Sequence, residues 1–300
     1  MATEEFVVSG EEAGERVDVF LRRHVPDMSR AKAKALAADG AVRIDGRRSR
    51  KGTLLQVGQT VSLDSAPPPR EFLAVPNADL PLTVVHEHAD WVVVDKPAGM
   101  AMHPLRPEEN DTLCNALVAR YPEMAEVGYA TREPGILHRL DNETSGLVLA
   151  ARNAEAFGAL RETLTSNGID KRYTALVAGE VIAPKTIDTP LAHEPGDGRK
   201  IKACFDEREG ERLNARPALT EVLTSEAWGK YSLVEVLASS ARRHQVRVHL
   251  AAFGHPLVGD VLYGGPEGSP RHLLHASMLA FEYGGERFEV RSELPADFKL

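Results

Sequence analysis

The chain has 300 residues, enough for one large domain or for two smaller domains that each bury a core. Its 43% hydrophobic and 27% charged residues are ordinary for a globular protein and argue against the disordered and fibrous classes. The formal net charge is −8, yet residues 14–64 hold 11 Lys and Arg against 6 Asp and Glu, a net of +5 that leaves −13 for the remainder. A basic module therefore accompanies an acidic body, and nucleic acid stays open as a partner.

Membrane attachment and disulfides are not expected. No apolar run approaches the roughly 18 residues that a membrane span needs, and the first ten residues lack the basic and apolar regions of a signal peptide. Cys114 and Cys204 lie far apart in sequence, so they predict neither a disulfide framework nor a thiolate zinc site. We therefore expect a cytoplasmic protein with reduced thiols.

The basic module, residues 14–64, predicts two helices followed by a hairpin. Apolar residues at helical spacing indicate the first helix: Val17, Phe20 and Leu21. A Pro-Asp pair ends this helix, and Ser29 is placed to cap a second helix over residues 30–38, with Gly40 as its C-cap. The segment "AVRIDG", with its Asp-Gly turn, and the segment "QTVSL" predict strands.

Basic side chains gather on this module. Arg30 and Lys34 are four apart and share a face of the second helix, and Arg43 lies on the strand that follows. A run of basic residues alone is as often a solvated surface as a site for phosphate contacts. The stretch "RVDVFLRRHVPDMSRAKAKALAADGAVRIDG", however, resembles the alpha-L RNA-binding domain, first known from a small-subunit ribosomal protein. The resemblance implies structured RNA as the partner, bound through its shape and backbone, with these three residues and Arg16 as RNA contacts.

A proline-rich stretch, "SAPPPREFLAVPNADL", follows the module. Three consecutive prolines favour an extended segment and cannot lie inside a helix or a central strand. We therefore expect a linker over residues 65–81 and a catalytic domain over residues 82–300.

The body of the chain predicts an α+β fold. β-rich runs recur through it: "LTVVHEH", "WVVVDKP", "LVLAAR", "YTALVAGEV", "YSLVEVLA", "HQVRVHLAAFG" and "FEYGGERFEV". Helices are expected between them at residues 112–120 and 154–167. Hairpin-like spacing in the C-terminal half favours a mostly antiparallel mixed sheet with flanking helices.

Several chemistries lack their motifs. The sequence has no GxxxxGK[ST], GxGxxG, GxSxG or HExxH pattern, which argues against nucleotide, dinucleotide, α/β-hydrolase and zincin sites. His86 and His88 are two apart, but no third ligand at a recognisable spacing accompanies them. We therefore expect no metal and no nucleotide cofactor.

The stretch "HRLDNETSGL" holds the residue of most interest, Asp141. An apolar strand is expected to lead into it and a second one to leave from Leu147, so that Asp141 lies in a polar turn between two rigid elements. Such a position suits a catalytic group, but it equally suits an aspartate that only bonds backbone amides of its own turn. On this stretch alone both interpretations stay open.

The longer stretch "HRLDNETSGLVLAARN" closely resembles the signature of RluA-type pseudouridine synthases. Other stretches match that family in the same order: "VVVDKPAGMAMHP", "KRYTALVAG", "RRHQVRVHLAAFGHPLVGDVLYG", "LLHASMLAF" and "LPADF". The resemblance covers nearly all of residues 82–300 and accounts for the N-terminal module, which many members carry. Two departures stand out: Ser240-Ala241 replaces the usual Thr-Gly, which could shift Arg242, and "FEYGGERFEV" lacks the usual His-Pro.

The resemblance implies a role for each site residue. Asp141 is the catalytic aspartate, which must be ionised either to attack the anomeric carbon or to remove the neighbouring ribose proton. Burial favours the neutral carboxyl, so a cation is needed beside it, and the family pattern assigns this to Arg242. Arg139 is expected to fill the space that a flipped uridine leaves, while Tyr173 stacks on the uracil and assists late proton removal.

Neighbouring motif residues are given supporting roles. Gln245 and Arg247 are expected to support the loop that carries Arg242. Lys96 and His103 are expected to be scaffold or RNA-loop residues, because no step of the reaction needs them.

The implied function is the isomerisation of specific uridines to pseudouridine, with large-subunit ribosomal RNA as the favoured target and transfer RNA as the alternative. The reaction involves no net redox change, and neither cofactor nor metal is expected. We expect a monomer. A non-catalytic RNA-binding or ribosome-assembly protein is a second hypothesis. A nucleoside or glycoside hydrolase is a third, and it would need a second carboxylate such as Glu143 and a positioned water.

Overall fold

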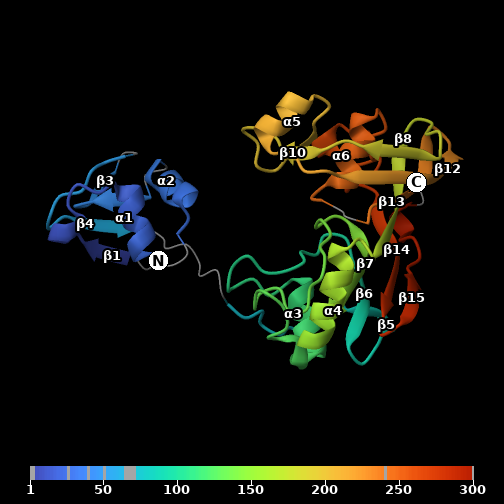
Figure 1. Cartoon of the computed structure of the whole chain (residues 1–300), viewed down its shortest axis with the longest axis horizontal. Coiled ribbons are helices and arrows are strands. Elements are labelled where there is room, and N and C mark those ends of the chain that lie inside the picture. The colour runs from blue at the N-terminus through green and yellow to red at the C-terminus, as the bar shows by residue number, and fades with distance from the viewer. Residues whose placement is uncertain are drawn as a thin grey trace. The chain divides into compact units, whose positions relative to one another are not determined.

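The computed structural model describes residues 4–25, 28–38, 41–49, 52–63, 72–239 and 242–298. The chain divides into two compact units, Met1–Phe72 and Leu73–Leu300, each with its own core (Figure 1). The predicted cap Gly40, the Pro-Asp pair at 26–27, the three consecutive prolines and the pair Ser240-Ala241 lie outside the described residues.

The first unit is a four-stranded antiparallel sheet with two helices, and it confirms the predicted order of helix, helix and hairpin. The sheet order is β1-β4-β2-β3. Its elements are β1 (Glu4–Val7), the 3-10 turn η1 (Gly10–Glu12), α1 (Val17–His24), α2 (Arg30–Ala38), β2 (Val42–Ile44), β3 (Arg47–Arg48) and β4 (Thr60–Leu63). Strand β1, which the sequence did not predict, pairs with β4.

Local chemistry explains these elements. The three apolar residues that indicated α1 are fully buried in the core of this unit: Val17, Phe20 and Leu21. The Ser29 hydroxyl accepts a hydrogen bond from the backbone N–H of Lys32 at 3.2 Å, which confirms the predicted N-cap. Asp45 and Gly46 adopt positive φ values of 50° and 76°, as a tight turn between β2 and β3 requires.

The second unit is built on a nine-stranded mixed sheet in the order β5-β6-β7-β14-β8-β13-β12-β9, with β15 paired to β14. The strands are β5 (Thr83–Glu87), β6 (Trp91–Lys96), β7 (Ser145–Ala151), β8 (Asp170–Ala178), β9 (Lys185–Asp188), β12 (Leu219–Trp228), β13 (Tyr231–Leu237), β14 (Leu274–Tyr283) and β15 (Glu286–Arg291). A two-stranded ribbon, β10 (Leu191–His193) and β11 (Ile201–Ala203), is separate. Apart from the parallel pair of β7 and β14, the strand pairs are antiparallel, which agrees with the predicted α+β class.

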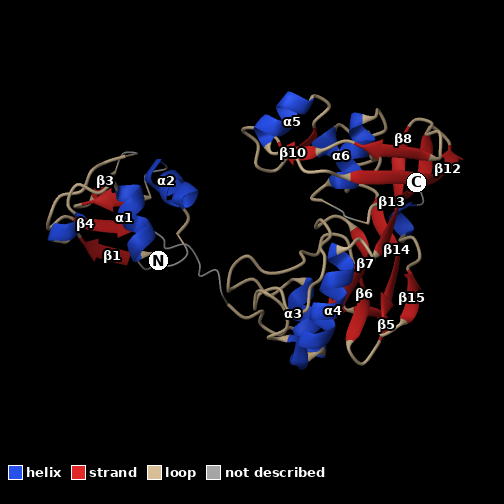
Figure 2. Ribbon diagram, viewed as in Figure 1, coloured by secondary structure: helices blue, strands red, loops and turns tan. Residues whose placement is uncertain are grey.

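Helices cover both faces of this sheet near β6 and β7, as the two core clusters there show. Figure 2 distinguishes the helices and strands of the chain by colour. The helical elements are α3 (Leu113–Arg120), η2 (Pro122–Met124), α4 (Ala154–Thr165), α5 (Glu207–Leu213), α6 (Gln245–Ala252), η3 (Val261–Tyr263) and η4 (Ala296–Phe298). Helix α3 packs with Val92 and Val148, whereas α4 packs with Val93 and Leu149. Because successive strand residues point to opposite faces, α3 and α4 lie on opposite sides, and every residue of β7 is buried.

The prediction of a strand at "HQVRVHLAAFG" was wrong, because this segment forms helix α6. Val246, Arg247 and Val248 alternate between apolar and charged side chains, a period of two that is typical of a strand. Every residue from Gln245 to Leu250 is buried, however, so polar and apolar residues both face the interior and no helical stripe is visible in the sequence.

Two boundaries also differ from the predictions. The apolar strand expected before Asp141 is reduced to a single bridge between Ile136 and Ala150. The second is the end of the predicted linker, residues 65–81, because the stretch that begins at residue 73 packs on the second unit. Asn115 donates its side-chain N–H to the carbonyl of Val75 at 2.7 Å, and Ala74 is buried.

The parallel pair of β7 and β14 fixes the start of β7, directly after the Asp141 turn. Gly146 lies opposite Ala276 with φ at +115°, and a Cβ at this position would lie 2.3 Å from the Ala276 carbonyl oxygen. Only glycine allows this approach of the two backbones. In the described part of the chain, no helix has the length and apolar character needed to cross a membrane.

Candidate active site

Asp141 lies in a turn that is anchored by β7. The backbone N–H of Thr144 donates to the Asp141 carbonyl at 3.0 Å, and the side chain of Asp141 is a quarter exposed. It lines a pocket that is open to solvent and has an empty volume of about 340 Å³. Pocket residues from distant parts of the chain include Arg139, Tyr173, Arg242, His244 and Arg247.

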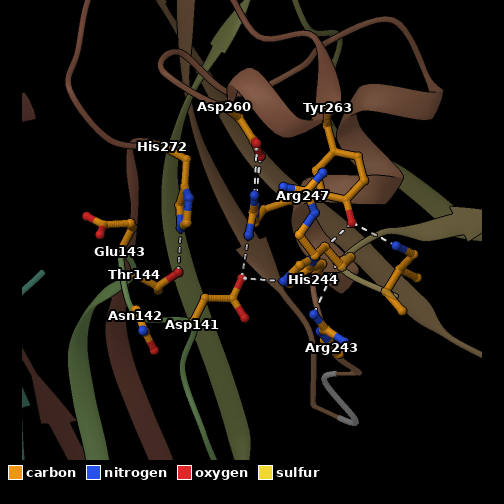
Figure 3. Close-up of polar contacts among 12 residues, drawn as sticks. Asp141, Asn142, Glu143, Thr144, Arg243, His244, Arg247, Asp260, Tyr263 and His272 are labelled. Atoms are coloured by element: carbon orange, nitrogen blue, oxygen red, sulfur yellow. Dashed lines mark hydrogen bonds and ion pairs between the residues drawn. The ribbon is translucent and has the colours of Figure 1, made fainter. Parts of the chain in front are cut away.

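Arg247 on α6 is the cation that contacts Asp141. Its Nη1 donates to Asp141 Oδ2 at 2.8 Å, while its Nε and Nη2 bond the two carboxylate oxygens of Asp260 at 2.7 and 2.8 Å (Figure 3). Burial opposes the charge on Arg247, but the hydrogen bonds and charges of Asp260 and Asp141 outweigh it and raise its pKa. A permanent positive charge therefore lies beside Asp141.

The sequence-based assignment of Arg242 as the partner of Asp141 is corrected by this geometry. Arg242 is exposed, its Nε donates to the carbonyl of Pro217 at 3.4 Å, and it lines the rim of the same pocket. The assignment came from the family pattern, which gave Arg247 only a supporting role. Arg247 lies in the first turn of α6, and its side chain faces Asp141. Gln245, as expected, supports Arg242, since its side-chain oxygen accepts the Arg242 backbone N–H at 2.8 Å.

Arg139 and Tyr173 both line the pocket, as a substrate-binding role requires. Tyr173 on β8 is buried, and burial together with the nearby charge of Asp141 raises the pKa of its phenol. With a raised pKa, little of the phenol is in the phenolate form that could accept a proton. Its aromatic face is better suited to stacking on a base.

His244 and Tyr263 form a second layer around Asp141. The Nε2 of His244 lies 3.7 Å from Asp141 Oδ2, and its Nδ1 lies 2.7 Å from the Tyr263 hydroxyl (Figure 3). The Tyr263 oxygen also accepts the backbone N–H of Ile201 at 3.0 Å. Burial lowers the pKa of His244, with the charge of Asp141 acting in the opposite direction. The sequence prediction gave neither residue a role in the site.

The turn after Asp141 is braced from the buried side. The ammonium of Lys96, which is fully buried, donates to the carbonyls of Pro97, Met100 and Asn142 at 2.8 to 2.9 Å. Arg271 donates to the carbonyl of Glu143 at 2.9 Å. The interpretation of Lys96 as scaffold is confirmed, and three carbonyls account for its three N–H donors.

A hydrogen bond across the sheet adds to this bracing. The Thr144 hydroxyl lies 2.8 Å from Nε2 of His272, and burial lowers the pKa of His272 to about 4. His272 is therefore neutral near pH 7. The two residues are 128 positions apart, so the Asp141 turn is held by a part of the chain that is remote in sequence.

The residues predicted to bind RNA lie in the first unit. Arg16 bonds both carboxylate oxygens of the buried Asp18, at 2.8 and 3.1 Å, and is partly exposed. Lys34 is exposed, and Arg43 donates to the Gly46 carbonyl at 3.4 Å. The side chain of Arg30 lies outside the part of the chain that the structure describes.

His86 and His88, the pair considered as metal ligands, pack against an aromatic ring in the structure. His86 and His88 both stack on Trp91, with ring centroids 5.0 Å apart in each case. Asp90 donates its backbone N–H to Nδ1 of His88 at 3.1 Å. Packing on an aromatic ring explains why two histidines occur at this spacing.

Two family models match the chain. The model described as RNA pseudouridylate synthase matches residues 90–252, and the S4 domain model matches residues 15–61. The first range includes Asp141 and Arg247, and the second includes most of the basic module.

Related proteins match over almost the full length. An uncharacterized RNA pseudouridine synthase of Chloroflexus aurantiacus is 40% identical, over 98% of this chain and 91% of the relative. The ribosomal large subunit pseudouridine synthase D of Xanthomonas campestris is 33% identical, over 98% and 89%. Among solved structures, human RNA pseudouridylate synthase domain containing 1 aligns with a TM-score of 0.57 and 28% identity, covering 73% of this chain and 85% of the human chain.

Proposed function

Because the chain belongs to the RNA pseudouridylate synthase family, and is therefore an isomerase that acts on uridine in RNA, we propose that it modifies specific uridines of large-subunit ribosomal RNA with Asp141 as the catalytic residue. The name of the X. campestris relative supports the ribosomal target. Transfer RNA is the alternative. With a ribosomal target, the expected location is the cytoplasm. We also propose that it acts as a monomer.

The observation that carries the catalytic assignment is the ion pair between Asp141 and Arg247 at the pocket. The reaction breaks the bond from ribose C1′ to uracil N1 and forms a bond from C1′ to C5. Asp141 attacks C1′ in one route and removes the C2′ proton in the other, and both routes start from the ionised carboxylate. Arg247 supplies the compensating charge, and Asp260 fixes the orientation of its guanidinium.

A uridine inside folded RNA must leave its stack to reach Asp141, which costs a few kcal/mol. We assign the vacated position to Arg139, because it lines the pocket and is exposed. Tyr173 offers its ring to the flipped uracil. The raised pKa of its phenol favours this stacking role over the removal of the late proton.

The S4 module is proposed to bind structured RNA through its basic side chains. Lys34 and Arg43 are the described candidates, and Arg30 belongs to the same helix as Lys34. Contacts of this kind go to phosphates and carry no sequence information, so the module adds affinity and the catalytic domain selects the uridine.

The test is a pseudouridine map of ribosomal and transfer RNA from cells that carry the wild-type gene, no gene, Asp141→Asn or Glu143→Gln. Glu143 is exposed and two positions away, which makes it a matched carboxylate control. We expect defined large-subunit sites to vanish without the gene and with Asp141→Asn, and to persist with Glu143→Gln. Loss of transfer RNA sites instead would refute the ribosomal target. Release of free uracil by the purified protein would indicate a hydrolase.

A further inference from the structure

The Nε2 atom of His244 faces the pocket and makes no direct hydrogen bond to Asp141. Its Nε2 lies 3.7 Å from Asp141 Oδ2, which is too long for a hydrogen bond, although the side chain is only 10% exposed. His244 precedes α6 in the left-handed region, with φ at 55° and ψ at 15°. A non-glycine residue keeps such a conformation only when its surroundings fix it, and such residues gather at functional sites.

Tyr263 fixes the state of the ring. Its oxygen accepts the Ile201 N–H at 3.0 Å, so its own hydrogen is available for His244 Nδ1 at 2.7 Å. A neutral imidazole that accepts at Nδ1 carries its proton on Nε2. Burial lowers the pKa of His244 and so favours this neutral form. The carboxylate of Asp141, which can only accept, favours the same tautomer, so we assign Nε2 as the donor.

A group that bridges His244 and Asp141 must accept from the first and donate to the second, because a carboxylate only accepts. The carbonyl oxygens of uracil only accept, and its N–H groups only donate. A ribose hydroxyl does both with one oxygen atom. The 2′-hydroxyl is attached to the carbon next to C1′, which is the atom at which Asp141 acts in the proposed function.

We propose that His244 recognises the ribose 2′-hydroxyl of the target uridine, donating from Nε2 to an oxygen whose hydrogen is donated to Asp141. This inference rests on the proposed role of Asp141 at the ribose, and it is independent of which RNA is modified. His244 thereby selects RNA over DNA at the reacting nucleotide, since the 2′-hydroxyl is the group that distinguishes them. Tyr263 acts as a positioning residue, because it contacts His244 and not the sugar.

The experiment compares a short RNA that contains a mapped target uridine with the same RNA carrying 2′-deoxyuridine or 2′-fluoro-2′-deoxyuridine at that position. Dissociation constants and single-turnover rates are measured for the wild type, His244→Asn and His244→Gln. Asparagine tolerates a positive φ but is too short to reach the hydroxyl, whereas glutamine can place an N–H near Nε2. The exposed His193 on β10 provides a matched control, His193→Asn.

The wild type and His193→Asn should bind the unmodified RNA about tenfold more tightly than the two sugar-modified RNAs, the effect of one hydrogen bond. His244→Asn should lose this preference, and His244→Gln should recover part of it. An equal preference in the wild type and His244→Asn would overturn the inference alone. A wild-type protein that forms no pseudouridine in the unmodified RNA would refute the proposed function and this inference with it.

The protonation of the ring gives a measurement in the free enzyme. The ¹⁵N signals of the His244 ring should show the proton on Nε2. Tyr263→Phe should remove the preference for this tautomer and reduce the difference in dissociation constant between the unmodified and the sugar-modified RNAs. A proton on Nδ1 in the wild type would overturn the inference, because Nε2 would then be an acceptor that faces a carboxylate.

Discussion

Asp260 holds Arg247 by two nitrogens, Nε and Nη2, and leaves Nη1 as the nitrogen that reaches Asp141. Both carboxylates therefore share one guanidinium, and the side chain of Asp260 is almost completely buried. The planar fork of arginine is needed for this arrangement, since a lysine ammonium presents a single point of charge.

Arg247→Lys should reduce the single-turnover rate about 10²- to 10³-fold, because the ammonium cannot bond both carboxylates and the charge beside Asp141 is lost or displaced. Arg242→Lys is the control in the same motif. Its side chain is exposed and bonds Pro217, so its rate at saturating RNA should change little. Equal losses for the two variants would contradict the assignment of Arg247.

Asp260→Asn should lower the free energy of unfolding by roughly 3 kcal/mol, because it leaves a buried guanidinium with only part of its counter-charge. Urea unfolding of the full chain measures this effect. Glu226→Gln, an exposed carboxylate on β12, should stay within about 0.5 kcal/mol of the wild type. If Asp260→Asn is as stable as the wild type, another group must compensate the charge of Arg247.

Lys96 predicts a dependence of stability on pH. Burial lowers its pKa from 10.5 to about 8, and the charge of Glu143 acts in the opposite direction. Between these values the unfolded chain keeps a proton that the folded chain has released, so the contribution of Lys96 to the free energy of unfolding rises with pH by about 1.4 kcal/mol per unit. Below pH 8 the contribution is constant.

Urea titrations at pH 7, 9 and 10 on the wild type and Lys96→Met separate this effect from other groups. At pH 7 the variant should be less stable by roughly 3 kcal/mol, since three carbonyls lose their donor. The difference should grow as the pH rises. A difference that stays constant would show that folded Lys96 titrates near its ordinary pKa.

Gly146→Ala should destabilise the second unit by more than about 3 kcal/mol or prevent its folding. The added Cβ would meet backbone atoms of Ala276 at 2.3 and 2.5 Å, and the φ of +115° is unfavourable for alanine. Gly158→Ala in α4 is the matched control, because no atom lies within 4 Å of its Cβ. That substitution should stabilise the helix by up to about 1 kcal/mol. Thermal melting monitored by circular dichroism distinguishes the two results.

Replacing Lys34 and Arg43 with alanine should weaken RNA binding and reduce the slope of log K against log salt by about 2, roughly one for each phosphate contact. Filter binding at several salt concentrations measures the slope. Lys230→Ala, in the turn between β12 and β13, should leave it unchanged. If the double variant keeps the wild-type slope, these side chains do not contact phosphates.

Much of the fold could be predicted because local signals agreed with tertiary structure. Helix α2 spans Arg30–Ala38, the range that was predicted from the cap at Ser29. The helix α6 could not be predicted, because burial on all sides removes the amphipathic pattern. The long strand β12 was missed for a related reason, since four of its last five residues are exposed and carry no clear alternation of apolar and polar residues.

The site was predictable where its residues are consecutive and less so where they meet only in space. Asp141 and Arg139 belong to one stretch, whereas Asp260 and Tyr263 lie in another matched stretch, which alone does not show that they reach Asp141. Arg247 was noticed in its motif but given a supporting role. The difference between Arg242 and Arg247 depends on helical geometry, which decides which side chain faces the carboxylate.

The separation of Asp141 from Arg247 by 106 positions has a consequence for synthesis on the ribosome. At about 5–20 residues per second, Arg247 is added roughly 5–20 s after Asp141. Throughout this interval the aspartate has no counter-charge, and its turn lacks His272, which is added later still. A nascent chain can thus complete its S4 fold, and with it an RNA-binding surface, before any catalysis is possible.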